Sequence, residues 1–406
     1  YDSVEKTKSF LDKGEKIIYE ATFFHDGVIV ALDVLVKDAQ GWKAYEVKSS
    51  TSVSDTYVKD AAIQYYTILN SGIDLKDISI VYINNQYVRE GKLKIDELFT
   101  IESVKDRVLE YLPAIPNKVS RLKSVIEKTS APDVEIGTHC SKPYVCDFKG
   151  TCWKNIPEYS VFNIANLNAD KKFDFYNKGI VTLDQIELSE STLSPNQILQ
   201  VQSEIDGTSY IDQDQIMKFT SSLRYPVYYL DFETIGPSIP VFEGSKPYQQ
   251  LVFQYSLHIQ EISGSESIHK EYLADPKEDP RIKFIEQLIL DCGVSGDILV
   301  YNIGFEKGKI EDLIETFPEH SIELQKIISR LKDLMVPFQK KWYYTPKMRG
   351  SYSIKQVLPA LVPELSYNDL EINEGGNASN TFLSMVNGTF KGNESQTRKS
   401  LLEYCK

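Results

Sequence analysis

The sequence lacks the features of a membrane-embedded or secreted protein. None of its apolar runs approaches the roughly 20 residues that a transmembrane helix needs, and no signal peptide is recognisable at its start. The chain opens abruptly on Tyr-Asp-Ser, as a fragment would. We therefore expect a cytoplasmic protein.

Basic residues are also in short supply. Lys and Arg total 45 against 58 Asp and Glu, which gives a formal net charge of −13. This is the wrong sign for a protein that coats nucleic acid nonspecifically. It does not exclude an enzyme that holds nucleic acid through local basic patches and binds metal ions through carboxylates. With 406 residues, 25% of them charged, we expect two or three domains with ordinary cores.

Cysteine is scarce, with 5 residues in the chain, yet Cys140, Cys146 and Cys152 fall close together. Such clustering in a cytosolic-looking chain favours a metal site over a disulfide. The spacing is not that of a zinc ribbon, and three thiolates leave one coordination position open. His139 could complete a zinc site, or the three thiols could be unligated, and both alternatives stay open.

The first half of the chain is organised around residues 28–48. Two apolar runs flank Asp38-Ala-Gln-Gly41, which predicts a β-hairpin. A symmetric turn places Asp33 opposite Glu46, with Lys48 on the same face as Glu46. Unpaired carboxylates on a buried face would cost several kcal/mol, so a divalent cation or an ion pair is implied. Two carboxylates suit Mg²⁺, and Lys48 would stabilise charge on a phosphoryl group. The alternative is a surface hairpin with a Glu46–Lys48 pair.

The pattern of Asp33 followed by Glu46-x-Lys48 resembles the restriction-endonuclease-like nucleases. With the upstream carboxylate Glu20 and a helix over residues 55–70 that carries Gln64, it resembles the RecB-like branch, and within it the CRISPR-adaptation nucleases. The resemblance implies Mg²⁺ or Mn²⁺ at Asp33 and Glu46. It also implies catalytic roles for five residues: Glu20, Asp33, Glu46, Lys48 and Gln64. Ile68 stands where the Gln-x-x-x-Tyr motif of that branch has its tyrosine.

The cysteine triplet resembles the one that ends the RecB-like iron–sulfur nucleases. The resemblance implies that Cys140, Cys146 and Cys152 hold an iron–sulfur cluster whose fourth cysteine lies upstream of the nuclease core. No cysteine precedes Cys140 in this sequence. We infer that the fourth ligand lies on a segment outside it, or that the cluster is incomplete here.

Residues 159–222 have the pattern of short amphipathic helices, with a break at Lys178-Gly179 and a helix start at Pro195. The Gly179-Ile180 turn resembles the helix-hairpin-helix units that hold a nucleic-acid backbone. A purely structural helical linker is the plainer interpretation, and we prefer it.

A second group of acidic residues begins where an apolar strand ends in Asp231-Phe-Glu233-Thr234. The two carboxylates share one face of that strand. Further along, a strand from Asp297 leads into a helix that carries Glu306, and Asp333 follows a helix. This succession resembles the RNase H-like fold, and the tetrapeptide resembles the first motif of the DEDD 3′–5′ exonucleases.

The exonuclease resemblance implies a pair of Mg²⁺ ions about 4 Å apart. Asp231 and Glu233 would hold them, with Glu306 in place of the second motif's aspartate. Tyr404 would orient the attacking water in a final Tyr-x-x-x-Asp motif, whose aspartate would fall two residues after Lys406. We therefore expect this site to be incomplete in the sequence as given. The alternative is an RNase H-like scaffold that binds no nucleotide.

Basic and aromatic residues alternate between the second and final motifs. The candidates for nucleic-acid contact are Lys340, Lys341, Trp342, Lys347 and Arg349. Such a mixture provides phosphate charge pairing and stacking surfaces for unpaired bases. A solvated loop is the alternative.

Taken together, these features resemble one bacterial family of fused nucleases with an α/β fold. Residues 1–157 would form a restriction-endonuclease-like mixed-sheet domain, 158–223 a helical linker, and 224–406 an RNase H-like mixed-sheet domain. We expect a Mg²⁺- or Mn²⁺-dependent nuclease that hydrolyses DNA, as an exonuclease in repair or defence. An RNA-directed 3′–5′ exonuclease and a catalytically impaired nucleic-acid-binding module remain alternatives.

Overall fold

The computed structural model describes residues 2–190, 192–365 and 375–406. The chain forms two compact units, one of residues Tyr1–Val134 with Pro237–Gln249, the other of Glu135–Gly236 with Gln250–Lys406. Each is a mixed α/β structure. The cysteine-bearing segment belongs to the second unit, whereas the sequence analysis assigned it to the first domain. In the part of the chain described, no helix is both long and apolar enough to cross a membrane.

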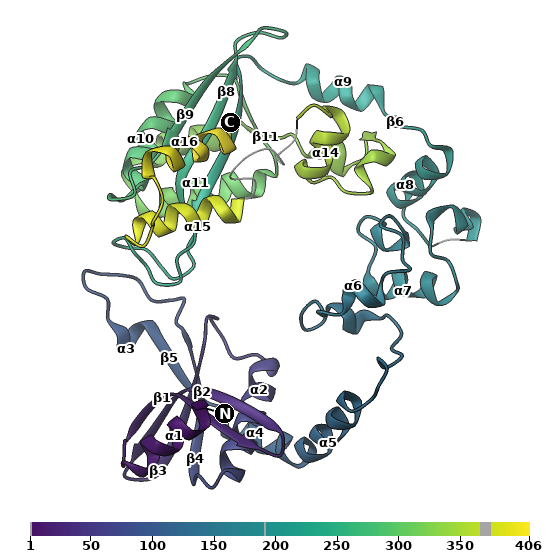
Figure 1. Cartoon of the computed structure of the whole chain (residues 1–406). Helices are drawn as coiled ribbons and strands as arrows, with labels where there is room; N and C mark the ends of the chain where they lie inside the picture. The colour runs from purple at the N-terminus through teal and green to yellow at the C-terminus, as the bar shows by residue number, and fades with distance from the viewer. Residues whose placement is uncertain (1, 191, 366–374) are drawn as a thin grey trace. The chain divides into compact units, whose positions relative to one another are not determined.

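The first unit is built on a five-stranded mixed sheet. Helix α1 (Asp2–Asp12) precedes it, and the strand order is β1-β2-β3-β4-β5. Strands β3 and β4 are parallel and the other neighbours are antiparallel. The strands are β1 (Ile17–His25), β2 (Val28–Asp38), β3 (Gly41–Lys48), β4 (Leu75–Ile83) and β5 (Phe99–Ser103). Helix α2 (Asp55–Asn70) connects the two parallel strands (Figure 1).

The predicted hairpin and its register are confirmed. Val34 pairs with Tyr45 and Leu35 with Ala44, so the turn is symmetric about Ala39 and Gln40. The Asp38 carboxylate accepts hydrogen bonds from the backbone N–H groups of Gln40 and Gly41, as turn aspartates commonly do. The helix predicted over residues 55–70 is also confirmed, and the Ser54 hydroxyl caps its start.

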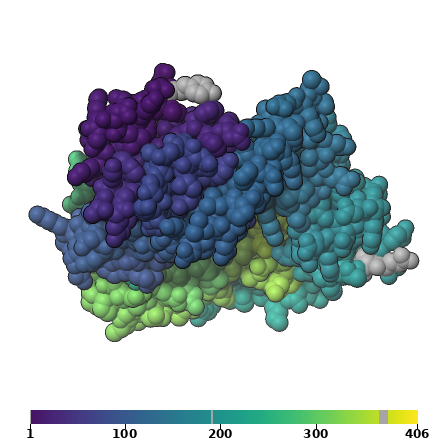
Figure 2. Space-filling model, turned by 90° about the horizontal axis from the view of Figure 1, so that it is seen from below, coloured from purple at the N-terminus to yellow at the C-terminus, as the bar shows by residue number. Residues whose placement is uncertain are grey.

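Three further helices complete the first unit: α3 (Ile95–Leu98), α4 (Lys105–Tyr111) and α5 (Ile115–Ile126). The short 3₁₀ turn η1 (Leu112–Ala114) lies between α4 and α5. Pro113 and Pro116 each occupy the first positions of an element, where a missing backbone N–H leaves no hydrogen bond unmade. Exposed side chains of this unit form the purple and dark-blue surface in Figure 2.

The second unit opens with short helices and turns. They are η2 (Thr138–Ser141), α6 (Lys149–Cys152), η3 (Val161–Asn163), α7 (Ala169–Asn177), η4 (Leu183–Gln185), η5 (Leu188–Glu190), α8 (Pro195–Asp206) and α9 (Gln213–Ser221). The predicted break after α7 is present, with Gly179 at φ 79°. The two-residue strand β6 (Tyr210–Ile211) pairs with β12 (Tyr343–Tyr344), so a loop from late in the chain belongs to this helical region.

A second five-stranded mixed sheet follows, in the order β11-β10-β7-β8-β9. Strands β7, β8 and β9 form an antiparallel meander, and β10 and β11 run parallel to β7. Their bounds are β7 (Val227–Ile235), β8 (Leu251–Gln260), β9 (Ser267–Leu273), β10 (Asp297–Val300) and β11 (Leu331–Asp333).

Helices cover both faces of this sheet. Helices α10 (Arg281–Cys292), α11 (Ile303–Thr316) and α12 (Ser321–Ile328) share a core with Tyr228, Leu230 and Phe232 of β7. Helices α15 (Gly375–Val386) and α16 (Glu394–Cys405) run over the other face (Figure 1). Alternation along β7 therefore turns Asp231 and Glu233 away from the larger core. The connections before α15 include η6 (Pro318–His320), α13 (Val336–Gln339), η7 (Pro346–Met348) and α14 (Ile354–Leu361).

Candidate functional site

The structure joins Glu46 and Lys48 of β3 directly. The Lys48 ammonium lies 2.8 Å from Glu46 Oε1 and 2.7 Å from Oδ2 of Asp60 on α2. Burial alone would lower the pKa of Lys48, but its hydrogen bonds to Asp60 and Glu46 raise that pKa above its ordinary value. Of the two possibilities that the sequence left open for this face, a cation or an ion pair, the described residues form the ion pair.

Two buried oxygens beside this pair have no hydrogen-bond partner among the described residues: Glu46 Oε2 and Gln64 Oε1. Gln64 follows Asp60 by one helical turn, about 6 Å along α2, and Glu46 precedes Lys48 by about 6.6 Å along β3. Because a helix that connects two parallel strands runs antiparallel to them, Gln64 lies toward the Glu46 side of Lys48. A polar group placed here would satisfy both oxygens.

Asp33 and Glu20 occupy the neighbouring strands. Asp33 Oδ2 accepts the backbone N–H of Val47 at 2.6 Å, so this carboxylate lies against β3. Glu20 is exposed at φ 53°, between the paired residues Tyr19 and Ala21. A positive φ in a strand is costly for a residue other than glycine. Glu20 and Asp33 therefore mark an irregular point in the sheet beside the Lys48 pair.

The second group of acids forms in the other unit around Glu306, the least exposed of them at 1%. Burial raises the pKa of Glu306 to about 8, with the Asp231 and Asp333 carboxylates adding to the shift. Burial likewise raises the pKa of Glu233 to about 7, with Asp231 contributing and Lys355 opposing. These effects place Glu233 and Glu306 each within electrostatic range of Asp231. Glu306 Oε2 has no hydrogen-bond partner among the described residues.

A cavity of about 450 Å³ opens at Asp231. The Asp231 residue keeps solvent contact through this cavity, but protein atoms surround its carboxyl group, and that desolvation raises its pKa to about 6. Ser256, Tyr301 and Tyr404 also line the cavity. We name it the carboxylate cavity.

The Tyr404 hydroxyl and the Glu233 carboxylate lie near the same residue, Gly375. A Cβ added at Gly375, the first residue of α15, would lie 3.6 Å from the Tyr404 hydroxyl and 3.6 Å from Glu233 Oε2. The start of α15 therefore lies near both groups. Asp231 of β7 thus has Glu233 of the same strand and Glu306 of α11 in its neighbourhood, and Tyr404 of α16 lies near Glu233.

Asp333 holds the start of α11 in place. Its carboxylate accepts the backbone N–H groups of Asn302, Ile303 and Met335 at 3.0, 3.2 and 2.9 Å. The bonds from Asn302 and Ile303 cap α11 from the end of β11. Glu306 lies in the first turn of that helix, so Asp333 fixes its position through the backbone.

No metal site is assembled in advance by the described residues. Among them, no group of three or more His, Cys, Asp or Glu side chains is placed to hold a metal ion. Cys140 is buried, Cys146 and Cys152 are exposed, and all three are free thiols. The Cys146 N–H donates to the Cys140 carbonyl at 3.0 Å, which keeps two of the cysteines on one turn. An iron–sulfur cluster at this triplet stays a prediction.

Lys341, one of the predicted nucleic-acid contacts, is buried, unlike its neighbour Lys340. The side chain is 4% exposed, and its ammonium lies 4.0 Å from the centre of the Tyr344 ring. Burial lowers its pKa to about 8, although Glu204 opposes the shift. Lys341 has φ 55°, a left-handed turn that a pattern of basic residues does not reveal.

The other residues of that loop remain candidates for contact with a ligand. Lys340, Lys347 and Arg349 are exposed, and Trp342 is half-buried beside Phe219. Arg349 forms an ion pair with Glu158.

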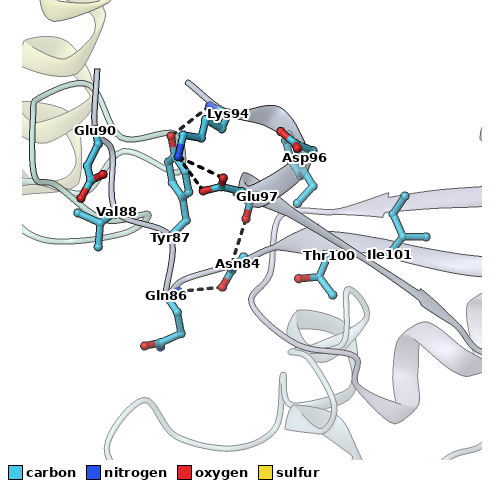
Figure 3. A pocket seen from close by; sticks show the side chains of 11 residues that line it. Asn84, Gln86, Tyr87, Val88, Glu90, Lys94, Asp96, Glu97, Thr100 and Ile101 are labelled. Atoms are coloured by element: carbon cyan, nitrogen blue, oxygen red, sulfur yellow. Dashed lines mark hydrogen bonds and ion pairs between the residues drawn. The ribbon is translucent and has the colours of Figure 1, made fainter. Parts of the chain in front are cut away.

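A separate cavity of about 650 Å³ lies in the first unit, next to β5 (Figure 3). Its polar groups bond to one another. Asn84 donates to the Glu97 carbonyl, Lys94 pairs with Glu97, and the Lys94 N–H donates to the Tyr87 hydroxyl. It contains none of the residues predicted to act in catalysis.

The sequence did not reveal that Asp60 pairs with Lys48 or that Asp333 accepts three backbone N–H groups. It also did not reveal that Gly375 lies near Glu233 and Tyr404. Asp60 had a usable signal, because it lies four residues before Gln64 and so on the same face of the predicted helix. Gly375 had none, because α15 meets β7 only in the folded chain.

Comparison with known proteins gives a partial match. Residues 228–353 match a family model described as a domain of unknown function (DUF2779). An uncharacterized protein of Ureaplasma parvum serovar 3 is 30% identical over 176 residues, which are 38% of this chain and 25% of that protein. An uncharacterized protein of Mycoplasma genitalium is 27% identical over 203 residues, 46% of this chain and 30% of that protein. The chain thus spans between 25% and 30% of the length of these curated relatives. No solved structure matches it.

Proposed function

We propose that this chain is a divalent-metal-dependent nuclease whose principal site is formed by Asp231, Glu233 and Glu306. One observation carries the proposal. Glu306 is buried, and one of its carboxylate oxygens has no partner among the described residues. Its burial raises its pKa, and the nearby Asp231 carboxylate adds to that shift. Buried like charges are costly unless something neutralises them.

A hard divalent cation fits this donor set. Mg²⁺ and Mn²⁺ take carboxylate oxygens, and Mg²⁺ keeps several waters, so it requires only one or two protein carboxylates. Asp231, Glu233 and Glu306 would hold the metal as these side chains adjust. When bound, the metal supplies a polarised phosphoryl oxygen and a water of lowered pKa.

The chain's own residues would do the rest of the chemistry. The Tyr404 hydroxyl, beside Glu233, would orient the attacking water toward the phosphorus. Asp333 would hold Glu306 in position through the start of α11. The carboxylate cavity would admit a strand end at Asp231.

Strand order supports the more specific form of the proposal. The second sheet is an antiparallel meander extended by two parallel strands. This strand order is compatible with an RNase H-like domain and would suit a DEDD-type 3′–5′ exonuclease. The antiparallel β1-β2-β3 followed by the α2 crossover to β4 is compatible with a RecB-like domain. There Asp33, Glu46, Lys48 and Gln64 would form a second nuclease site. DNA is the proposed substrate, in repair or defence.

The test is a cleavage assay on the full chain with 5′-labelled single- and double-stranded DNA, and RNA, in Mg²⁺ or Mn²⁺. We expect a ladder of products that shorten from the 3′ end. Asp231→Asn should lower the rate by at least 100-fold. Asp275→Asn is the matched control, because it makes the same charge change at an exposed position of this unit. Absence of cleavage by the unaltered chain, or equal rates for both variants, would overturn the proposal.

A second candidate is a nucleic-acid-binding module without catalysis. The Lys48 pair favours it, because Lys48 already neutralises Glu46 and Asp60 in the first unit. Tight binding of oligonucleotides without cleavage in any metal would support this alternative.

A further inference from the structure

A cavity of about 600 Å³ in the second unit adjoins the carboxylate cavity. It lies between the helical region around η3 and the loop that follows β10. Tyr301 and Ile354 line both cavities, so the two share a wall. We name this second cavity the linker cavity. A polymer whose end reached Asp231 would have room to extend into it.

The charge of the linker cavity is opposite to that of the chain. None of the residues that line it is Asp or Glu, although the chain carries 58 of these against 45 Lys and Arg. Lys172 and Arg349 both line it. This local excess of positive charge favours an anionic ligand, because nearby cations attract phosphates even on an acidic protein.

Lys172 and Arg349 can each contact a ligand without breaking a strong interaction. Lys172 donates one hydrogen bond, to the Phe162 carbonyl at 2.7 Å, and its ammonium has three N–H groups. Arg349 pairs with Glu158, whose side chain is 81% exposed, and such surface pairs exchange readily. Phe162, Tyr301 and Tyr352 add aromatic surface to the same cavity. Cations beside aromatic rings are the combination that binds unpaired nucleotides.

Unusual backbone conformations gather at this cavity as well. Asn166, Asn302 and Arg349 line it with φ values of 55°, 77° and 48°. Left-handed conformations outside glycine are uncommon and cluster at binding sites. Asparagine adopts this conformation readily, so Arg349 is the residue at which the surrounding structure holds a costly backbone conformation.

We propose that the linker cavity binds single-stranded nucleic acid and leads it toward the carboxylate cavity. Lys172 and Arg349 would pair with its phosphates, and the aromatic rings would stack on its bases. This inference rests on the proposed function, because it names the part of the substrate that lies beyond the cleaved nucleotide. The sugar is not specified by this chemistry, so both DNA and RNA strands are tested.

The first experiment measures binding without cleavage. Fluorescence anisotropy with labelled twelve-nucleotide oligo(dT) and oligo(U), in EDTA, gives dissociation constants for the full chain. Asn166→Asp places a negative charge at the cavity and should weaken binding of at least one strand by 5-fold or more. Asp tolerates the left-handed conformation of Asn166, so the fold should persist.

The control variant changes Asn168, which lies two residues after Asn166. Asn168→Asp makes the same charge change at the start of α7, outside the cavity, and preserves the cap on Lys171 N–H. We expect it to bind within 2-fold of the unaltered chain. Equal weakening by both variants, or by neither, would overturn the proposal.

A second pair of variants reports on the phosphate contact itself. Arg349→Asn should weaken binding and reduce the slope of log affinity against log salt by about 0.7, the value for one phosphate contact on a single strand. Lys218→Asn, at an exposed position of α9 outside the cavity, should leave the slope unchanged. A lower affinity for Arg349→Asn with an unchanged slope would contradict a direct phosphate contact.

These measurements separate the two proposals. If Asn166→Asp loses binding but the unaltered chain cleaves nothing in Mg²⁺ or Mn²⁺, the linker cavity is supported and the nuclease is not. If the chain cleaves and binds equally well in all four variants, the nuclease stands and the linker cavity is excluded.

Discussion

Two lysines show how differently one residue type can be used in this chain. Lys48 is half-buried and held by two carboxylates, which keep it charged. Lys341 is buried beside an aromatic ring, with Glu204 as the one carboxylate that opposes the fall of its pKa. The sequence predicted a functional role for both, and the structure places Lys48 beside two carboxylates and Lys341 in the interior.

Lys341 should make stability depend on pH. Its folded pKa of about 8 lies below the ordinary value of 10.5, so the unfolded chain binds more protons between these two values. Stability therefore rises with pH across that window. Lys341→Met should raise the free energy of unfolding by roughly 3 kcal/mol at pH 7, at about 1.4 kcal/mol per pKa unit, and by less at pH 9.5. Urea unfolding at both pH values checks this, and an equal gain at each would contradict it.

The Lys48 pair gives a prediction for the first unit. Lys48→Met leaves Glu46 buried at 7% exposure without its partner, which should lower the free energy of unfolding by about 1–3 kcal/mol. If this face accepts a cation, Mn²⁺ should raise the melting temperature of the variant more than that of the unaltered chain.

The control for that experiment is Lys59→Met. Lys59 pairs with Asp55 on the same helix, but both side chains are more than half exposed. We expect little loss of stability and no difference in response to Mn²⁺. A Mn²⁺ response equal in both variants would exclude a specific cation site at Glu46.

At the scale of elements, the sequence predicted what depends on local pattern. The β2–β3 hairpin, α2, β7 and the strand-to-helix step from β10 to α11 all follow from alternation, turn residues and helical spacing. Asp231 and Glu233 could therefore be placed on one strand face in advance. The β6–β12 pair could not, because it joins segments more than 130 residues apart whose two-residue strands carry no pattern.

The same limit explains why the sequence did not reveal the burial of Lys341 in the basic loop. Residues 340–352 belong to the helical region through contacts that only the folded chain reveals. Tyr344 donates to Glu204 at 2.9 Å, and the Gly350 N–H donates to the Tyr344 hydroxyl. A polar network of this kind buries Lys341 and leaves its neighbours exposed.

Gly350 should be essential to that packing. It has φ 78°, and a Cβ there would lie 2.4 Å from the Asn163 carbonyl oxygen. Gly350→Ala should therefore lower the free energy of unfolding by about 2–4 kcal/mol.

Gly388→Ala separates the clash from the backbone strain. Gly388 has φ 67° with nothing within 4 Å of the added Cβ, so only about 1–2 kcal/mol is expected. Chemical denaturation of both variants tests the pair, and a smaller loss at Gly350 than at Gly388 would contradict the packing described.

At the scale of the whole molecule, each unit carries its own acidic group on a mixed sheet. In the first unit a lysine neutralises the carboxylates. In the second, burial raises the pKa values of Asp231, Glu233 and Glu306, and the Asp231 carboxylate adds to the shifts of the other two. The second unit is thus the one whose electrostatics call for a cation, and the proposed nuclease depends on it.

The most direct measurement is a calorimetric titration of the full chain with Mn²⁺ at pH 6 and pH 8. Carboxyl groups with pKa values of about 6, 7 and 8 must release protons before they bind a metal. We therefore predict saturable binding that is at least 10-fold tighter at pH 8 and releases protons at pH 6. Glu306→Gln should weaken it, and Asp275→Asn should not. No saturable binding, or the same affinity at both pH values, would contradict the proposal that these three acids hold a metal.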